Sequence, residues 1–242
     1  MKNAKSVFSK NTSILKYSLA ITNVGLWTSE LDLVNKWFRN KQENLLDLGC
    51  GAGRTSFNLQ ELGYQNIYAI DISKEMVDTA LQIAKSLPNN TIRFKYMDAC
   101  DLIFPNNFFE YAFFSFNGFI GIPSEKSRIL ALKEIYRTLK PNGIFIFTAH
   151  LRDEEKYRQR LKLENIQQTQ EFKIESKGDL IFKNEDGFYD FFHLYNKDEL
   201  VNLLTENGFE VISTINRDES YNETKEVIEF ADNTYFWICK KV

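Results

Sequence analysis

One short stretch, Leu45 to Thr55, constrains the fold more than any other part of the chain. Its apolar start, Leu45 to Leu48, is long enough for a buried strand and too short for a helix. Three glycines follow at alternate positions: Gly49, Gly51 and Gly53. A helical pattern begins at Arg54; glycine lets a ligand approach the backbone, and a helix start has free N–H groups. The stretch therefore predicts a strand, turn and helix that hold a nucleotide-like ligand.

The rest of the chain continues this alternation of strands and helices. Apolar segments of strand length lie at residues 66–71, 92–97, 110–116, 144–148, 209–215 and 234–240. Helical patterns follow Ser73, Pro123 or Ser124, and Asn196 or Asp198. Such alternation is typical of a doubly wound sheet with right-handed crossovers. We expect a Rossmann-like α/β fold: seven strands, mostly parallel with the last strand antiparallel, and helices on both faces.

The length suits a single domain over residues 1–242. Residues 1–44 are expected to form a helical lead-in, with a helix over 28–38 that Ser29 caps.

Two later segments depart from the alternation. Residues 151–195 are predicted to form a substrate-cap insertion, because a highly charged stretch over 152–170 precedes an aromatic-rich stretch over 171–195. We expect a solvated helix in the first stretch and irregular strands in the second. The polar segment 216–233 is expected to be an exposed connection.

Composition narrows the classes of partner. The formal net charge is −3 with acids and bases nearly balanced, so no field of the whole chain attracts nucleic acid or an anionic membrane. The three cysteines lie far apart and the chain has two histidines, which argues against a structural metal site or a disulfide framework. There is no apolar run of membrane-spanning length, and the start is polar, with Lys2, Lys5 and Lys10. We expect a cytoplasmic location, no metal and no membrane partner.

Five motifs in a fixed order resemble one known family. The glycine stretch Asp47 to Gly53 comes first, Asp71 ends the second strand, and Asp98-Ala99 ends the third. Leu139 to Gly143 precedes the fifth strand, and Glu206 to Phe209 precedes the sixth. Over nearly the whole chain from the glycine stretch onward, this order resembles the class I S-adenosylmethionine-dependent methyltransferases.

The resemblance implies S-adenosyl-L-methionine as cofactor and S-adenosyl-L-homocysteine as its product. Asp71 lies 18 residues after Gly53, close to the spacing of about 20 expected for a carboxylate that takes ribose hydroxyls. By resemblance, Asp98 and the backbone of Ala99 contact the adenine.

The same resemblance places Asp47 at the methionine ammonium and Phe116 at the sulfonium, and aromatic faces attract cations. The predicted cofactor-binding residues are Asp47, Gly49, Gly51, Gly53, Asp71, Ile72, Met76, Asp98, Ala99 and Phe116. A dinucleotide-binding dehydrogenase is the main competitor with this fold, and its fingerprint has glycines at the first, third and sixth positions. Counted from Gly49, the sixth position is Arg54, so the spacing favours the methyltransferase.

The acceptor is predicted to be a small molecule, because the marks of other acceptors are missing. After the fourth strand the chain reads Ser115-Phe116-Asn117-Gly118, without the two prolines of amino-methylating DNA enzymes. No cysteine follows a proline, as cytosine-C5 enzymes require, and the carboxylate cluster of metal-dependent catechol-type enzymes is missing. No basic stripe with interleaved aromatic residues marks a nucleic-acid groove.

Methyl transfer requires alignment of nucleophile, methyl carbon and sulfur, and a base where the acceptor is a hydroxyl or a protonated amine. The candidate catalytic residues are His150 and His193. The candidate substrate-binding residues are Tyr17, Trp27, Asn117 and Tyr189, with Tyr17 and Trp27 as a possible lid.

The predicted function is O- or N-methylation of a small, partly apolar acceptor, by a monomer or weak homodimer. The alternatives are methylation of RNA, tRNA or protein, and a non-catalytic S-adenosylmethionine-binding protein. Basic residues between Arg152 and Lys162 keep RNA open, although acids lie among them. The intact glycine turn, Asp71 and Asp98 favour an active enzyme.

Overall fold

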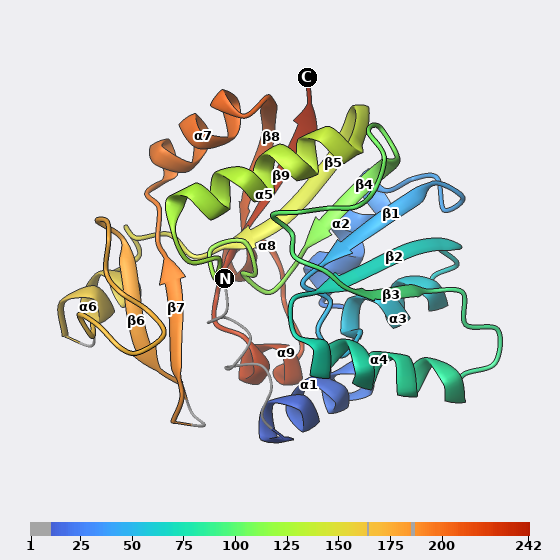
Figure 1. The fold of residues 1–242 in the computed structure, drawn as a ribbon, viewed down its shortest axis with the longest axis horizontal. Helices are drawn as coiled ribbons and strands as arrows, with labels where there is room; N and C mark the ends of the chain where they lie inside the picture. The colour runs from blue at the N-terminus through green and yellow to red at the C-terminus, as the bar shows by residue number, and fades with distance from the viewer. Residues whose placement is uncertain (1–10, 164, 185–186) are drawn as a thin grey trace.

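A seven-stranded sheet forms the centre of the molecule, and a two-stranded sheet lies to one side of it (Figure 1). The computed structural model describes residues 11–163, 165–184 and 187–242. Three lysines of the polar start lie outside the described residues: Lys2, Lys5 and Lys10. The large sheet has the strand order β3-β2-β1-β4-β5-β9-β8. Its strands are β1 Asn44–Leu48, β2 Asn66–Asp71, β3 Arg93–Tyr96, β4 Phe109–Phe114, β5 Leu139–Ala149, β8 Phe209–Asn216 and β9 Tyr235–Lys241.

Strand directions confirm the expected fold class. Neighbours from β3 to β5 are parallel, and β9 is antiparallel to both β5 and β8. The fifth strand begins earlier than residue 144, because Leu139 pairs with Phe109 ahead of an irregularity, after which Ile144 pairs with Tyr111.

Helices cover both faces of the large sheet. They are α2 Thr28–Trp37, α3 Arg54–Glu61, α4 Lys74–Ser86, α5 Glu125–Thr138 and α7 Lys197–Glu206. Leu46 and Leu48 of β1 belong to a core with Leu132 of α5. Leu45, one position away, belongs to the other core, with Leu33 of α2. Strands buried on both faces are near-continuous apolar runs, which is why the sequence identifies them.

Parallel pairing brings the carboxyl ends of the first strands to one edge of the sheet. Leu48 pairs with Ile70, and Asp71 pairs with Tyr96. Ser73 caps α4 as predicted, because its hydroxyl accepts a hydrogen bond from the Met76 N–H at 3.3 Å. Ligands of doubly wound sheets bind beyond this edge.

Residues 151–195 form a ribbon beside that edge (Figure 1). The ribbon contains α6 Glu155–Leu163 and an antiparallel pair, β6 Asp179–Lys183 and β7 Tyr189–His193. The charged helix is shorter than residues 152–170 and is not wholly solvated, because Tyr157 is buried against the His150 ring, with centroids 4.3 Å apart.

The connection 216–233 is mostly exposed, as its polar composition predicts, and it also forms two short helices. It contains α8 Arg217–Ser220 and α9 Lys225–Phe230, and it buries Arg217 and Val227. α9 lies beside α1 Asn11–Asn23 beyond the carboxyl ends of the strands (Figure 1). A few buried side chains among many polar ones are enough to dock two short helices.

The start of α2 is stabilised by a residue distant in sequence, so the predicted Ser29 cap is wrong. Trp27 precedes the helix. The Glu223 carboxylate accepts hydrogen bonds from the backbone N–H groups of Thr28 at 2.7 Å and Ser29 at 3.0 Å. A negative side chain at a helix N-terminus satisfies free donors and complements the helix dipole.

Candidate functional site

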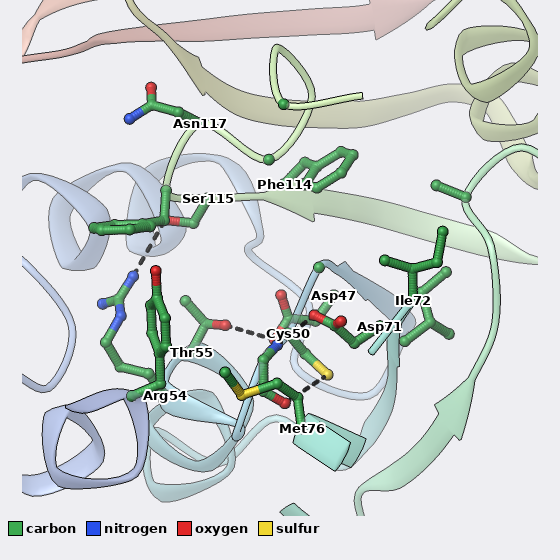
Figure 2. A pocket seen from close by; sticks show the side chains of 18 of the residues that line it. Asp47, Cys50, Arg54, Thr55, Asp71, Ile72, Met76, Phe114, Ser115 and Asn117 are labelled. Carbon is green, nitrogen blue, oxygen red and sulfur yellow. Dashed lines mark hydrogen bonds between the residues drawn. The ribbon is translucent and has the colours of Figure 1, made fainter. Parts of the chain in front are cut away.

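A cavity at the carboxyl edge of the sheet has two chemically different halves, and Figure 2 labels several residues that line it, among them Asp47 and Asp71. Its polar half comes from the strand ends and the turns that follow them: Asp47, Gly49, Cys50, Gly51, Ala52, Thr55, Ile70, Asp71, Ile72, Met76, Met97, Asp98 and Ala99. Its aromatic half draws on α1, the β4–α5 loop, the ribbon and α9: Tyr17, Phe116, Phe172, Phe192 and Phe230. Every predicted cofactor-binding residue lines the cavity except Gly53.

The glycines of the turn serve different purposes. Gly49 has φ +62°, and a Cβ there would lie 2.8 Å from the Phe114 ring. Gly51 has φ +54°, and a Cβ there would meet nothing within 4 Å, so it would occupy open cavity space. A Cβ on Gly53 would lie 2.6 Å from the Phe57 ring. Packing therefore requires Gly49 and Gly53, whereas Gly51 leaves room for a ligand.

Asp47 is buried under the turn and has one oxygen without a partner. Its Oδ2 accepts hydrogen bonds from the hydroxyls of Thr55 at 2.6 Å and Ser56 at 2.5 Å. Its Oδ1 has no hydrogen-bond partner among the described residues. Burial raises the pKa of Asp47 to about 6, against the two hydroxyls and Arg54, which lower it. A buried oxygen left without a donor is costly, so a cationic N–H group of a ligand would be stabilised there.

Asp71 holds the glycine turn and lines the cavity at the same time. Its Oδ2 accepts a hydrogen bond from the Gly51 N–H at 2.8 Å, and its Oδ1 accepts one from the Ser73 N–H at 2.7 Å. Burial raises the pKa of Asp71, and backbone hydrogen bonds oppose that rise. Each carboxylate oxygen keeps acceptor capacity for a second donor, which suits a ribose diol.

Asp98 and Ala99 follow β3 on the same side of the cavity. The Asp98 Oδ1 accepts a hydrogen bond from the Cys100 N–H at 2.9 Å, which fixes the carboxylate at the strand end. Ile72 and Met76, at the start of α4, add apolar surface (Figure 2). The polar half thus offers carboxylates at three strand ends and an apolar wall for a flat base.

Comparison with known proteins finds a methyltransferase domain in part of the chain. Residues 45–143 match a family model described as a methyltransferase domain. The demethylmenaquinone methyltransferase of Oceanobacillus iheyensis is 31% identical to the chain over 103 residues, which are 42% of each protein. The chain spans less than half the length of the first curated relatives that it matches.

Solved structures share the fold over most of the chain. A SAM-dependent methyltransferase from Methanosarcina mazei superposes with a TM-score of 0.70 at 23% identity, covering 90% of this chain and 99% of that one. Residues 45–143 are therefore similar to a methyltransferase domain, and most of the chain shares the fold of a solved S-adenosylmethionine-dependent methyltransferase. A second neighbour, the [4+2]-cyclase SpnF, has a TM-score of 0.69 at 16% identity and covers 98% of this chain and 95% of that one.

The cavity fits S-adenosylmethionine, the cofactor that the resemblance to methyltransferases implies. The unpartnered Asp47 oxygen suits the methionine ammonium, and the space beside Gly51 admits a ligand close to the backbone. Among the described residues, no group of three or more His, Cys, Asp or Glu side chains could hold a metal ion. A separate finding is that no described helix is both long and apolar enough to cross a membrane.

Phe116 and Asn117 hold strained backbone conformations at the cavity wall, with φ +54° and +61°. Asn117 is fixed by three hydrogen bonds: its N–H donates to the Thr148 hydroxyl at 2.7 Å, and its Oδ1 accepts from the Thr234 hydroxyl at 2.7 Å. Its Nδ2 lies 3.0 Å from His150 Nε2. The network presents both predicted residues to the cavity.

His150 belongs to this network and does not line the cavity. Its Nδ1 lies 2.9 Å from the carbonyl oxygen of Asn233. A carbonyl accepts and an amide NH2 group donates, so a neutral ring protonated on Nδ1 satisfies both Asn233 and Asn117. Burial lowers the pKa of His150 to about 3. The geometry makes His150 a positioning residue for Asn117, and its predicted catalytic role has no contact with the cavity to support it.

The alternation of β7 separates four neighbouring residues. Asp190 and Phe192 line the cavity, whereas Tyr189 and His193, predicted as substrate-binding and catalytic, do not. His193 Nδ1 lies 2.6 Å from Asp179 Oδ1, and burial lowers the pKa of this histidine. Asp190 was missed in the sequence because the register of a short strand decides which side chains face the cavity.

Of the two predicted lid residues, only Tyr17 lines the cavity. Its ring lies 5.9 Å from that of Phe116, centroid to centroid, in an edge-to-face contact. Trp27 is fully buried between two guanidinium groups, 5.3 Å from Arg54 and 5.0 Å from Arg217. Trp27 is thus a packing residue that joins the lead-in to the C-terminal connection.

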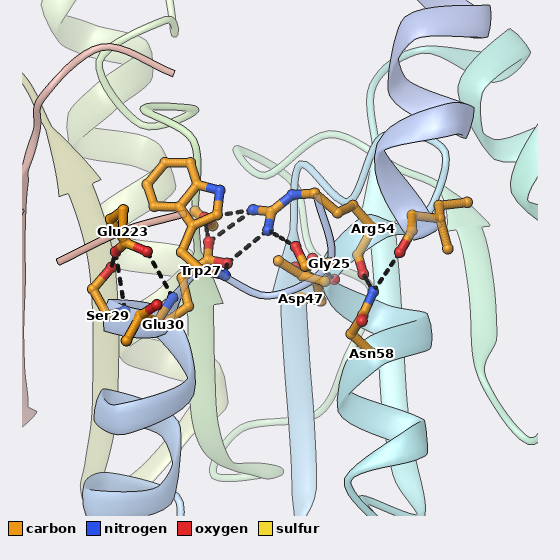
Figure 3. Close-up of polar contacts among 12 residues, drawn as sticks. Gly25, Trp27, Ser29, Glu30, Asp47, Arg54, Asn58 and Glu223 are labelled. Atoms are coloured by element: carbon orange, nitrogen blue, oxygen red, sulfur yellow. Dashed lines mark hydrogen bonds and ion pairs between the residues drawn. The ribbon is translucent and has the colours of Figure 1, made fainter. Parts of the chain in front are cut away.

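A buried ion pair fixes the lead-in against the glycine turn (Figure 3). Arg54 Nη1 and Nη2 donate to the two carboxylate oxygens of Glu30 at 2.6 and 2.7 Å, and Nη1 also donates to the Gly25 carbonyl at 2.7 Å. Glu30 accepts further hydrogen bonds from the Trp27 N–H at 2.9 Å and from the Ser115 hydroxyl. No sequence spacing announces this pair, because its partners lie on separate helices.

Proposed function

We propose that this chain is an S-adenosylmethionine-dependent methyltransferase that acts on a small, flat, partly apolar acceptor through O- or N-methylation. One observation carries the proposal: a single cavity joins the free Asp47 oxygen and the carboxylates of Asp71 and Asp98 to a half lined by aromatic rings. The polar half suits the cofactor, and the aromatic half suits an acceptor presented to the methyl group.

The cofactor assignment uses one group for each part of the molecule. Asp47 Oδ1 would take the methionine ammonium, Asp71 the ribose hydroxyls, and Asp98 with Ala99 the adenine edge. Phe116, where the two halves meet, would lie against the sulfonium, whose positive charge an aromatic face attracts. When bound, the cofactor supplies the electrophilic methyl group, and the chain's own residues orient the reactants and exclude water.

The elements that line the aromatic half support a small acceptor. α1, α9 and the β6–β7 ribbon each contribute a side chain there: Tyr17, Phe230 and Phe192. A pocket lined by side chains from separate elements suits a small molecule, because such pockets bury most of a small ligand's surface. The matched relative from Oceanobacillus iheyensis is named a demethylmenaquinone methyltransferase, and demethylmenaquinone is a quinone, not a nucleic acid or a protein.

RNA is a weaker candidate for the acceptor, because two of the basic residues between Arg152 and Lys162 are paired with acids. Arg152 is buried and pairs with Glu199 at 2.6 Å, and Lys156 pairs with Asp232 at 2.6 Å. Paired charges offer little to a phosphate backbone. A function other than methyl transfer is the second candidate, because SpnF, which has the same fold, is a [4+2]-cyclase.

Calorimetric titration with S-adenosylmethionine and S-adenosylhomocysteine tests the cofactor part. We expect the wild type to bind both, and Asp71→Ala to bind each at least about 10-fold more weakly, since charge-assisted hydrogen bonds to the ribose are lost. Asp101→Ala is the matched control, because Asp101 is exposed and outside the cavity. Absence of binding to the wild type below about 1 mM would contradict the proposal, that concentration being a weak-affinity threshold. Transfer of labelled methyl into a fractionated cell extract, with mass spectrometry, identifies the acceptor.

A further inference from the structure

The aromatic half of the cavity contains one carboxylate, Asp190 of β7. Asp190 and Phe192 point to the same side of the strand, since they are two residues apart, and both line the cavity. Phe172 and Phe230 line the same half. A carboxylate among aromatic rings is a strong recognition element, because an ionised acceptor forms stronger hydrogen bonds than a neutral one.

The hydrogen-bond partners of Asp190 are neutral. Among the described residues, Asp190 Oδ1 accepts a hydrogen bond from the Phe191 N–H at 3.1 Å, and the Asn184 side chain also bonds to the carboxylate. Arg160 of α6 acts on Asp190 electrostatically, while its guanidinium lies 4.2 Å above the Phe182 ring. Burial raises the pKa of Asp190 to about 6, against the hydrogen bonds and Arg160. A base with a pKa near the working pH is the most effective kind.

The charged residues that line the cavity further restrict the chemical class of the acceptor. Four carboxylates line it: Asp47, Asp71, Asp98 and Asp190. Among the described lining residues, Arg54 is the only cation, and its two terminal nitrogens bond to Glu30. An anionic acceptor would therefore be repelled, and an uncharged one would lose least on desolvation.

We propose that Asp190 accepts a hydrogen bond from the nucleophilic O–H or N–H of the acceptor and takes up its proton, and that the acceptor is an uncharged, flat ring compound. This inference rests on the methyltransferase function proposed above. The O–H or N–H bond breaks and its proton goes to the Asp190 carboxylate. The electron pair left on the nucleophile forms the bond to the methyl carbon, and the pair of the breaking carbon–sulfur bond stays on sulfur.

Three probes that share the naphthalene ring system and differ in one substituent test recognition of the acceptor: 2-naphthol, 2-aminonaphthalene and 2-naphthoate. Binding to the chain is measured by fluorescence in the presence and absence of S-adenosylhomocysteine. We expect the wild type to bind the two donor probes at least about 10-fold more tightly than the anionic one, as the loss of a charge-assisted hydrogen bond implies. Asp190→Asn should bring the three affinities within about threefold, because the charge is removed.

Asp153→Asn is the matched control, since Asp153 is an exposed acid in the same segment and is outside the cavity. It should keep the wild-type order of affinities. Asp190→Ser replaces Asp190→Asn if the asparagine variant does not fold by circular dichroism. Wild-type protein that binds 2-naphthoate as well as 2-naphthol overturns the acceptor class, as does an unchanged ratio in the Asp190 variant.

Methyl transfer to the two donor probes tests the proton acceptor. We expect Asp190→Asn to lower kcat about 100-fold, in the range of general-base contributions, with the affinity for S-adenosylhomocysteine unchanged. A wild-type rate in this variant overturns the role of Asp190 as base. No transfer to either donor probe by a cofactor-binding wild type overturns the acceptor class. If the wild type binds no cofactor, the proposed function fails, and the probe affinities of the chain alone still decide whether Asp190 recognises the donor.

Discussion

Asn117 at the cavity wall and His150 after β5 are joined by a hydrogen bond of 3.0 Å, and the histidine is buried in its neutral form. Protonation of His150 would break its hydrogen bond with Asn117, so the structure of the cavity wall depends on pH. His150 therefore affects the site through Asn117, without touching the cavity.

The first prediction concerns stability in acid. Burial lowers the pKa of His150 from 6.5 to about 3, so the unfolded chain binds a proton that the folded chain refuses. This contribution to stability is present above about pH 6.5 and is lost as the pH falls toward 3. The loss at pH 4.5 is about 2 to 3 kcal/mol, since each pKa unit corresponds to about 1.4 kcal/mol. In His150→Gln, the fall of Tm between pH 7 and about 4.5 should be smaller than in the wild type by the corresponding amount. Parallel curves for the two proteins would contradict the assignment.

The second prediction concerns cofactor affinity and pH. Asp47 must be ionised to hold an ammonium, and burial raises its pKa to about 6. The affinity for S-adenosylmethionine should therefore rise with pH, and calorimetry should find it about 10-fold weaker at pH 5 than the limit at high pH. Asp47→Asn should bind weakly at every pH. The same raised pKa gives the opposite sign for folding, because Asp47 contributes stability below about pH 4 that is lost as the pH rises through 6. Affinity that does not vary between pH 5 and 7 would place the ammonium elsewhere.

The third prediction separates two glycines of one turn. Both have positive φ, so an alanine at either position carries a strain of about 1 to 2 kcal/mol. Gly49→Ala additionally forces a Cβ to 2.8 Å from the Phe114 ring and should lower the free energy of unfolding further, by about 1 to 3 kcal/mol. Gly51→Ala should cost only the strain, yet it should bind S-adenosylhomocysteine more weakly, because its Cβ enters the cavity. Denaturant unfolding and calorimetry measure the two effects. Equal loss of stability in both variants would remove the distinction.

Local patterns in the sequence are enough to place the residues of the polar half at one edge of the sheet. The strand at Leu45, the glycine turn and Asp71 lie within one strand–turn–helix unit and the strand after it, so their geometry follows from short-range rules. Asp98 followed from the same rule at the next strand end. These are features that chain order alone places at one edge of a parallel sheet.

The aromatic half depends on contacts between distant segments, and sequence patterns suggested only two of its rings, Tyr17 and Phe116. Phe230 reaches the cavity because α9 docks on α1, more than 200 residues away in sequence, and the polar composition of 216–233 predicts only an exposed connection. Asp190 and His193 lie on opposite faces of β7, and the pairing of β7 with β6 decides which face is turned to the cavity. A shift of one residue exchanges the two faces of a strand, so neither choice could be made from the ribbon sequence.

The last prediction concerns the ion pair between Glu30 and Arg54. Both side chains are buried, and each carboxylate oxygen accepts from a guanidinium nitrogen, so neutralising one partner leaves the other charge without compensation. Glu30→Gln should lower the free energy of unfolding by about 3 to 5 kcal/mol, as broken buried pairs do. Glu223→Gln, which weakens only the partly buried contact at the start of α2, is the matched control and should cost at most about 1 kcal/mol. Because Arg54 also lines the cavity, Glu30→Gln should alter cofactor affinity as well, whereas Glu223→Gln should not. Equal destabilisation by the two variants would show that the pair contributes no more than a surface contact.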